Sequence, residues 1–135
     1  MIGGMVADTC GIVNLMRNRG SEKRFFSKIR GKKLRIIIPC FVVKEVKKIT
    51  GFDREEIISF FSKFDKKVSV IECNEDIKLG SEYFEKKYST SHFPDTLLLA
   101  IASFHSYCIL TYDKVVLACA QAEGIKTICP KGECY

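Results

Sequence analysis

The stretch HFPDTLLLAIASFHSYCILTYDK, residues 92–114, decides the fold. The nearly continuous apolar run that follows Asp95 is typical of a helix inside a protein core. Residues 107–112, YCILTY, predict a strand covered on both faces, as parallel strands are. Asp113 follows this strand directly, so an acid stands at each end of a buried unit. A buried carboxylate needs water, a cation or a partner charge, although each acid taken alone is equally explained as an ordinary helix-start or turn residue.

The same alternation of strand and helix continues on both sides of this stretch. Further strands are predicted at residues 1–8, 34–38, 68–73 and 125–129, with helices at 10–16, 39–50, from 53, from 74 and from 114 to 123. Strands that alternate with helices indicate a three-layer α/β/α fold, with a mostly parallel central sheet of about four or five strands and helices on both faces. No linker divides the 135 residues, so we expect one domain spanning residues 1–135.

Helical periodicity also predicts which side chains face the core. Val42 and Ile49 fall on the expected inner face of the helix at 39–50. Leu79 and Tyr83 are expected to face inward from the helix that begins at 74, and Phe104 is expected to be buried with the rest of the apolar run.

Four acids occur where strands end or helices begin. Asp8 ends the first predicted strand, as Asp113 ends a later one, while Glu45 and Asp95 lie near helix starts. In a parallel sheet all four would converge at the carboxyl edge. Together they would repel one another, and a divalent cation removes that repulsion; oxygen ligands alone indicate Mg²⁺ or Mn²⁺. Glu45 is equally explained by pairing with a neighbouring lysine.

Residues 17–35 contain nine Lys or Arg and a single acid, Glu22. This run predicts a surface that contacts phosphates, with Arg24, Lys28 and Arg30 as candidates, although a solvated face is the alternative. Without the four proposed ligands, 12 of the 16 acids remain against 22 basic residues, and a basic rim around an acidic pocket would hold a nucleic acid by its phosphates. Because the chain lacks both the G-x-x-x-x-G-K-[ST] and the G-x-G-x-x-G motif, nucleoside triphosphate chemistry is disfavoured.

These residues together resemble a known family over essentially the whole chain. The pattern consists of Asp8-Thr9 after a first strand, P-x-x-V-x-x-E ending at Glu45, Pro94-Asp95 opening an apolar helix, and Thr111-x-Asp113 after a strand. This pattern looks like a PIN domain, and more narrowly it is similar to the VapC toxins of prokaryotic toxin–antitoxin pairs.

The resemblance implies a metal-dependent endoribonuclease that hydrolyses RNA phosphodiester bonds. It implies Mg²⁺ or Mn²⁺ held by Asp8, Glu45, Asp95 and Asp113, with Thr9 and Thr111 in support; Val115 stands where the family often has another acid. It further implies a homodimer and an antitoxin protein as partners. The alternatives are a PIN nuclease for RNA maturation or housekeeping and a non-catalytic RNA-binding PIN scaffold.

The remaining sequence features concern location and thiols. The first residues lack the basic flank and long apolar core of a signal peptide. No apolar run approaches the ~20 residues of a membrane span, so we expect a cytoplasmic protein without membrane contact. Seven cysteines occur without a C-x-x-C pair. Cys129 and Cys134 are the only close pair, and we expect them to be thiols without a metal.

Overall fold

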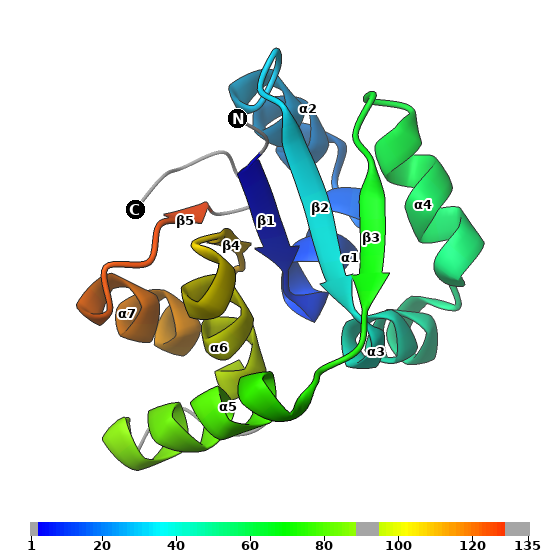
Figure 1. The fold of residues 1–135 in the computed structure, drawn as a ribbon. Helices are drawn as coiled ribbons and strands as arrows, with labels where there is room; N and C mark the ends of the chain where they lie inside the picture. The colour runs from blue at the N-terminus through cyan, green and yellow to red at the C-terminus, as the bar shows by residue number, and fades with distance from the viewer. Residues whose placement is uncertain (1–2, 89–94, 129–135) are drawn as a thin grey trace.

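Five parallel strands form the centre of the computed structural model, which describes residues 3–88 and 95–128 (Figure 1). The strands are β1 (Gly3–Ala7), β2 (Leu34–Pro39), β3 (Val68–Ile71), β4 (Cys108–Leu110) and β5 (Thr127–Ile128). The helices are α1 (Thr9–Arg17), α2 (Arg19–Lys28), α3 (Cys40–Thr50), α4 (Arg54–Ser62), α5 (Glu75–Lys87), α6 (Asp95–His105) and α7 (Lys114–Ala122). The predicted α/β fold with a parallel sheet is confirmed.

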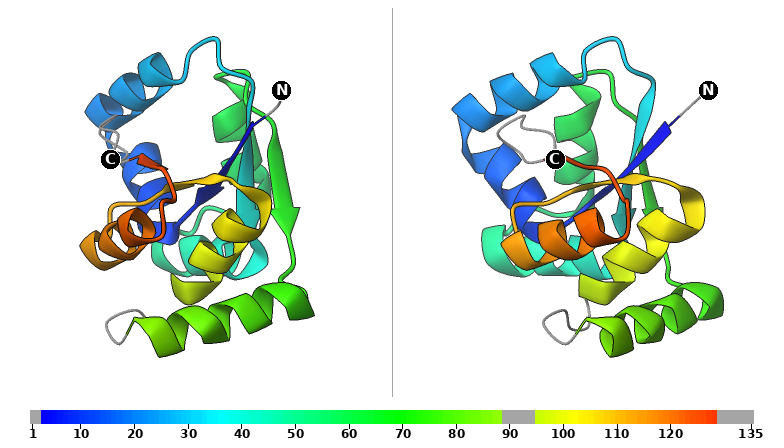
Figure 2. Two further views of the ribbon diagram at one scale, coloured as in Figure 1. Left: turned by 60° about the vertical axis from the view of Figure 1, so that its left-hand side comes forward. Right: turned by 90° about the vertical axis from the view of Figure 1, so that its left-hand side faces the viewer.

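The strand order, β3-β2-β1-β4-β5, reverses beside β1. From β1 the chain proceeds to β2 and then β3 on one side, and it returns to form β4 on the other side of β1. Helices α1 and α2 lie on one face of the sheet and α6 on the other, with α5 packed on the outside of α6 (Figure 2). The carboxyl ends of β1 and β4 therefore flank a topological switch point, the place where open parallel sheets bind ligands.

The core is formed by apolar strands and one helix buried on nearly all sides. The residues Met5 to Ala7 of β1 and Ile36 to Ile38 of β2 are all buried. Every residue from Thr96 to Ala102 in α6 is also buried, because α6 lies against the sheet, α5 and α7. Helix α5 approaches α6 closely at Gly80, where an added Cβ would lie 3.1 Å from the Cβ of Ala100.

Several side chains that periodicity assigned to the core are instead exposed. Leu79 and Tyr83 are 62% and 53% exposed, because α5 packs on α6 through the opposite face of the helix. Ile49 and Phe104 are also more than half exposed, each near the C-terminal end of its helix. Val42 is buried as predicted. Ile77 and Phe84 of α5 are buried, so the apolar residues of this helix lie on two faces and only one of these faces packs on α6.

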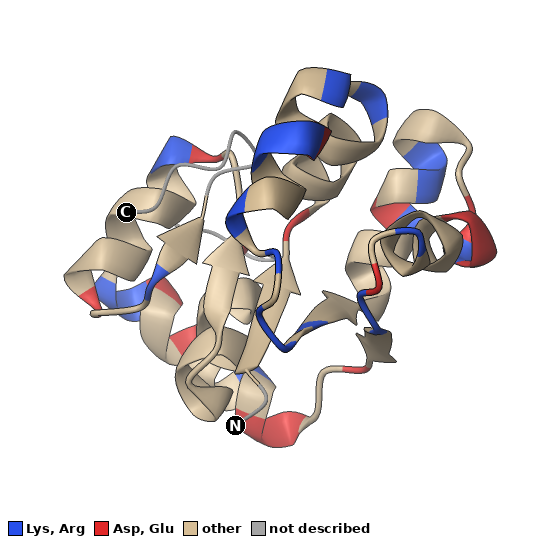
Figure 3. Ribbon diagram, turned by 90° about the horizontal axis from the view of Figure 1, so that it is seen from above, with Lys and Arg blue, Asp and Glu red and all other residues tan. Residues whose placement is uncertain are grey.

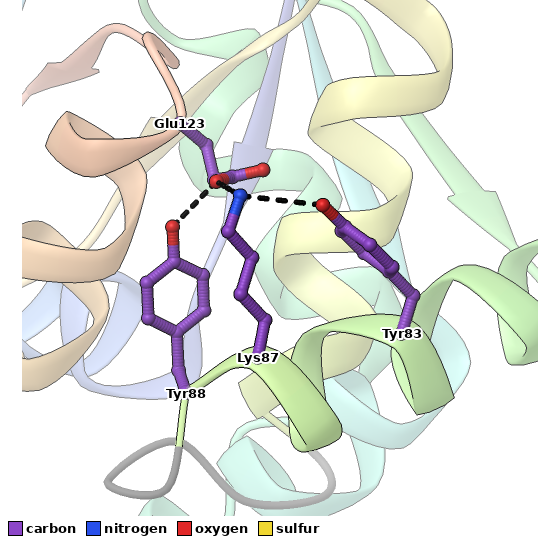
Figure 4. A network of polar contacts seen from close by, with 4 residues as sticks. All are labelled: Tyr83, Lys87, Tyr88 and Glu123. Carbon is purple, nitrogen blue, oxygen red and sulfur yellow. Dashed lines mark hydrogen bonds and ion pairs between the residues drawn. The ribbon is translucent and has the colours of Figure 1, made fainter.

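A network of polar contacts joins the C-terminal ends of α5 and α7 (Figure 4). The Lys87 Nζ donates to the Glu123 carboxylate at 2.7 Å and to the Tyr83 hydroxyl at 3.2 Å. The Tyr88 hydroxyl donates to the same Glu123 oxygen at 2.5 Å. The ammonium of Lys87, followed by the hydroxyl of Tyr88, lowers the pKa of the Glu123 carboxyl. Opposite charges thus meet directly at this point of the fold.

No helix within the described ranges is both long and apolar enough to cross a membrane.

Candidate functional site

A pocket of about 730 Å³ lies at the switch point, and its lining includes all four acids that the sequence singled out. Asp8 follows β1, Asp113 follows β4, Glu45 comes from α3, and Asp95 is the first residue of α6. We call this cavity the acidic pocket. Arg17 is the only Lys or Arg among the described residues that line it. The topology has therefore brought together four carboxyls from distant parts of the chain.

Asp8 is held at the end of β1 by its backbone and by both carboxylate oxygens. Its backbone N–H donates to the carbonyl of Leu110 at 2.9 Å, which continues the pairing of β1 with β4. One carboxylate oxygen accepts from the Thr9 N–H at 2.7 Å, and the other from the Thr111 hydroxyl at 2.8 Å. Asp8 is also the N-cap of α1. The strand ends one residue earlier than expected, which leaves Asp8 free to cap the helix.

Thr111 links the two acids that follow strands. It is fully buried, and its hydroxyl donates to Asp8 while accepting from the Asp113 N–H at 3.1 Å. The Asp113 carboxylate in turn accepts from the N–H groups of Val115 and Val116 at 2.8 and 3.4 Å, and so caps α7. Each of these two carboxyls is oriented by fixed donors, which is the kind of support that metal-binding and catalytic acids require.

Burial raises the pKa of the Asp8 carboxyl above its ordinary value. Hydrogen bonds from Thr111 and Thr9 lower it in part, and the negative charge of Asp113 raises it further. The charged form of Asp8 is therefore disfavoured by its surroundings. A cation in the pocket would reverse this balance, because it stabilises carboxylates that repel one another.

Cys10 is a residue of the site that sequence reasoning missed. Its Sγ lies 3.5 Å from the Asp8 carboxylate, as a donor, and accepts from the Tyr112 N–H at 3.4 Å. Burial, followed by the charge of Asp8, raises the pKa of the Cys10 thiol to about 11. Cys10 is thus a protonated thiol that supports Asp8. Its place two residues after Asp8, in the first turn of a helix, was the available signal.

Glu45 and Asp95 are both half-buried in the lining of the acidic pocket. The ion pairs within residues 3–88 and 95–128 join Lys78 to Glu75 and Lys87 to Glu123. Glu45 is therefore not paired with a lysine of the described part of the chain, and that alternative explanation of Glu45 loses its support. Ile49 lies one helical turn beyond Glu45 and lines the same pocket, which accounts for an apolar side chain in an exposed position.

The basic residues of segment 17–35 do not surround the acidic pocket, contrary to the expected basic rim. Of this segment's basic residues, only Arg17 lines that pocket. Arg24 and Lys28 are exposed on α2, and Arg30 lines a second pocket at the start of β2. Pro94 and the cysteines 129 and 134 lie outside the described residues.

The four carboxyls are of the type that Mg²⁺ and Mn²⁺ prefer, because hard cations take oxygen ligands. Among the described residues, no three Asp, Glu, His or Cys side chains are arranged to hold a metal ion as they stand. A cation would have to draw the carboxyls closer together on binding. The donor set fits such an ion in chemistry, and the hydrogen bonds to Asp8 and Asp113 orient two of its members. The assignment of these residues as metal ligands stays a prediction.

Comparison with known proteins finds similarity in structure only. No protein-family model matches the chain, and no curated protein matches its sequence. A toxin–antitoxin complex from Klebsiella pneumoniae is 17% identical with a TM-score of 0.67, covering 93% of this chain and 97% of that one. VapBC-1 from nontypeable Haemophilus influenzae is 16% identical with a TM-score of 0.65, covering 94% and 98%. DNA-bound VapBC from Salmonella typhimurium is 13% identical with a TM-score of 0.63, covering 96% and 99%. Identities this low establish the fold alone, and at that level the resemblance is confirmed: the chain has the PIN-like α/β fold found in these toxin–antitoxin structures.

Proposed function

We propose that this protein is a metal-dependent endoribonuclease that hydrolyses RNA phosphodiester bonds in the acidic pocket, as the VapC-type toxin of a toxin–antitoxin pair. The observation that supports it most strongly is the buried Thr111 hydroxyl, which orients Asp8 and meets the backbone of Asp113 at the switch point. One side chain thus connects the two acids that follow neighbouring strands, which orients both of them toward the same pocket. The fold likeness to toxin–antitoxin structures supports the toxin role.

The chain's own residues would bind and orient the reacting groups. Mg²⁺ or Mn²⁺ held by Asp8, Glu45, Asp95 and Asp113 would supply neutralisation of phosphate charge and activation of water. Thr9 and Thr111 keep the Asp8 oxygens in place, so that little rearrangement is needed when RNA arrives. The Arg17 guanidinium donates to the carbonyl of Ile49 at 3.3 Å and lines the pocket, where it would meet an RNA phosphate.

Cleavage of single-stranded RNA by the Asp8→Asn variant is the direct test. We expect cleavage to fall by more than about 100-fold, since a ligand should matter more than a residue that only orients one. Glu82→Gln, which alters an exposed acid on α5, is the matched control and should cleave normally. EDTA should stop the wild-type reaction and Mg²⁺ or Mn²⁺ should restore it. Full cleavage in EDTA would overturn the proposal.

The toxin role and its partners need a separate experiment. Production of the wild-type chain in bacteria should arrest growth, and Asp8→Asn should not. Co-production of a small protein encoded beside this gene should restore growth and bind the chain. If the chain cleaves RNA rapidly but neither arrests growth nor has a neighbouring gene for such a small protein, the alternative function, a nuclease for RNA maturation or housekeeping, would be favoured instead. Sedimentation of the purified chain tests the proposed homodimer.

A further inference from the structure

A second pocket, of about 780 Å³, lies at the amino edge of the sheet, where β2 and β3 begin. Five basic residues of its lining come from α2, the loop after it and the start of β2: Lys23, Arg30, Lys32, Lys33 and Arg35. Three more basic residues come from the end of α4 and the loop before β3: Lys63, Lys66 and Lys67. Figure 3, which views this edge from above, shows Lys and Arg gathered along these loops. We call this cavity the basic pocket.

The charge of the basic pocket is not neutralised by the protein itself. The one acid in its lining is Asp65, against eight Lys or Arg. None of these eight forms an ion pair with a carboxylate of residues 3–88 or 95–128. Cations crowded around one cavity repel one another unless a ligand of opposite charge enters. The charge therefore points to a polyanion.

Hydrogen bonds hold the walls of the basic pocket in place. The Lys66 Nζ donates to the carbonyls of Ile29 and Lys32, at 3.3 and 2.7 Å, and so ties the loop before β3 to the loop before β2. The Arg35 guanidinium donates to the Ser69 hydroxyl at 2.8 Å across the two strands. Two of the eight cations are therefore fixed in place by hydrogen bonds to the protein.

One partly buried aromatic ring, that of Phe64, lies among the cations and favours one class of polyanion. The partly buried Phe64 lines the pocket and stacks with one face on Phe26, a core residue only 8% exposed, with ring centres 3.7 Å apart and planes within 7°. Positive grooves with aromatic side chains are typical of proteins that bind single-stranded nucleic acid, because phosphates meet the cations and bases stack on the rings. An acidic peptide would use the cations but has no need of the ring.

We propose that the basic pocket binds the phosphate backbone of single-stranded RNA, at the sheet edge opposite the acidic pocket. The inference deepens the proposed function, because it gives the same RNA substrate a second contact. Strand β2 runs from the basic pocket at Leu34 to Pro39, just before α3 and Glu45. Its six residues span roughly 20 Å at ~3.3 Å per residue. An RNA that occupies both pockets must bridge about that distance.

The test compares two variants of equal charge change. Arg30→Gln, Lys33→Gln and Lys67→Gln together remove three exposed cations of the basic pocket. Lys47→Gln, Lys86→Gln and Lys126→Gln together remove three exposed lysines outside both pockets. Binding of a fluorescent oligouridine of about 16 nucleotides would be measured by anisotropy across a salt series. EDTA is present throughout, so that no cleavage enters the result.

The basic-pocket variant should bind RNA more weakly, and its slope of log affinity against log salt should fall by about 2, at ~0.7 per lost phosphate contact. The control variant should keep most of the wild-type slope. Equal losses in the two variants would overturn the proposal, because binding would then follow net charge alone. Competition by polyglutamate as effective as that by RNA would also overturn it, in favour of an acidic protein segment. Thermal unfolding of each variant confirms that it is folded.

The outcome is separable from that of the proposed nuclease activity. Asp8→Asn should bind oligouridine in EDTA with the wild-type salt slope, whether or not the protein is a nuclease. Conversely, the basic-pocket variant should still cleave a dinucleotide too short to reach the amino edge, if the acidic pocket is catalytic.

Discussion

The two edges of the sheet carry opposite charges, and they hold them in different ways. At the carboxyl edge, Asp8 and Asp113 are oriented by short hydrogen bonds, some of them buried. At the amino edge, most of the cations are exposed and long-chained, and only Lys66 and Arg35 are anchored. A site built from oriented groups should lose its function when one group changes. A site built from many equivalent charges should lose affinity a little at a time.

After the loss of a carboxylate itself, as in Asp8→Asn, the largest effect is expected from breaking the link between the two strand-end acids. Thr111→Val removes the hydroxyl that donates to Asp8 and accepts from the Asp113 N–H. Leaving buried polar groups without partners costs about 1–3 kcal/mol of unfolding free energy. RNA cleavage should fall by about 10- to 100-fold, as when an orienting residue is lost.

Thr111→Ser is the control for that prediction, because it keeps the hydroxyl and removes only a methyl group. It should recover most of the cleavage rate. If the Thr111→Val and Thr111→Ser variants cleaved RNA equally well, the hydroxyl that links Asp8 to Asp113 would have no part in catalysis. Denaturant unfolding of both variants separates loss of stability from loss of activity.

The pH dependence of stability tests how far burial disfavours the charged form of Asp8 at the carboxyl edge. Burial raises the pKa of Asp8 above its ordinary 3.8, so the folded chain keeps a proton that the unfolded chain has already lost. The free energy of unfolding should therefore fall as pH rises from about 3.8 through the raised pKa, and stay lower above it. A tenfold difference in proton affinity between the folded and unfolded chain corresponds to about 1.4 kcal/mol of unfolding free energy.

Asp8→Asn should remove this fall, leaving the variant at least as stable as wild type at neutral pH in EDTA. Urea unfolding at several pH values between about 4 and 7 measures the difference. A wild-type curve that rises with pH in this window, with Asp8→Asn below it, would show that the pocket stabilises the charged carboxyl without a cation.

The contrast between the edges also explains which features could be read from the sequence. Asp8 and Asp113 could be placed because each directly follows a predicted strand, and parallel strands share a carboxyl edge. The basic pocket could not be placed, because its two parts, residues 23–35 and 63–67, meet only when β2 and β3 begin side by side. A run of charged residues shows no periodicity from which the segment that packs beside it could be predicted. Strand order is a tertiary property.

The errors on individual side chains have a similar origin. Leu79 and Tyr83 belong to an apolar face of α5 that the periodicity recognised, but α5 packs through its other face. Cys10 was not predicted as a residue of the site, although a helix that starts at Thr9 brings its thiol to Asp8. Local pattern assigns a side chain to a face; only packing decides what the face meets.

A smaller effect is expected outside the basic pocket on the same helix. Arg24 and Lys28 are exposed on α2, and neither lines the basic pocket. Arg24→Gln with Lys28→Gln should therefore change the salt slope of RNA binding by less than Arg30→Gln alone, which should lower it by ~0.7. Anisotropy with the same oligouridine measures both. A larger change in salt slope from the Arg24 and Lys28 substitutions would mean that the phosphate contacts lie on the outer face of α2. The sequence alone first indicated that surface.

The smallest effect should come from the place where opposite charges meet. Glu123→Gln removes the ion pair with Lys87 while keeping an acceptor for Tyr88. Exposed ion pairs contribute little, because solvent screens them and ordering the side chains opposes the gain. The midpoint of thermal unfolding should therefore fall by less than about 3 °C. Lys87 and then Tyr88 lower the pKa of Glu123, so the pair's contribution is present above the ordinary pKa of 4.5 and is lost as pH falls through the lowered value. Wild type and Glu123→Gln should then converge in stability at acid pH, and both should bind and cleave RNA equally. A change in RNA cleavage on losing this ion pair would mean that the contact between α5 and α7 influences the acidic pocket. The Lys87–Glu123 pair would then contribute to catalysis and not only to the packing of the two helices.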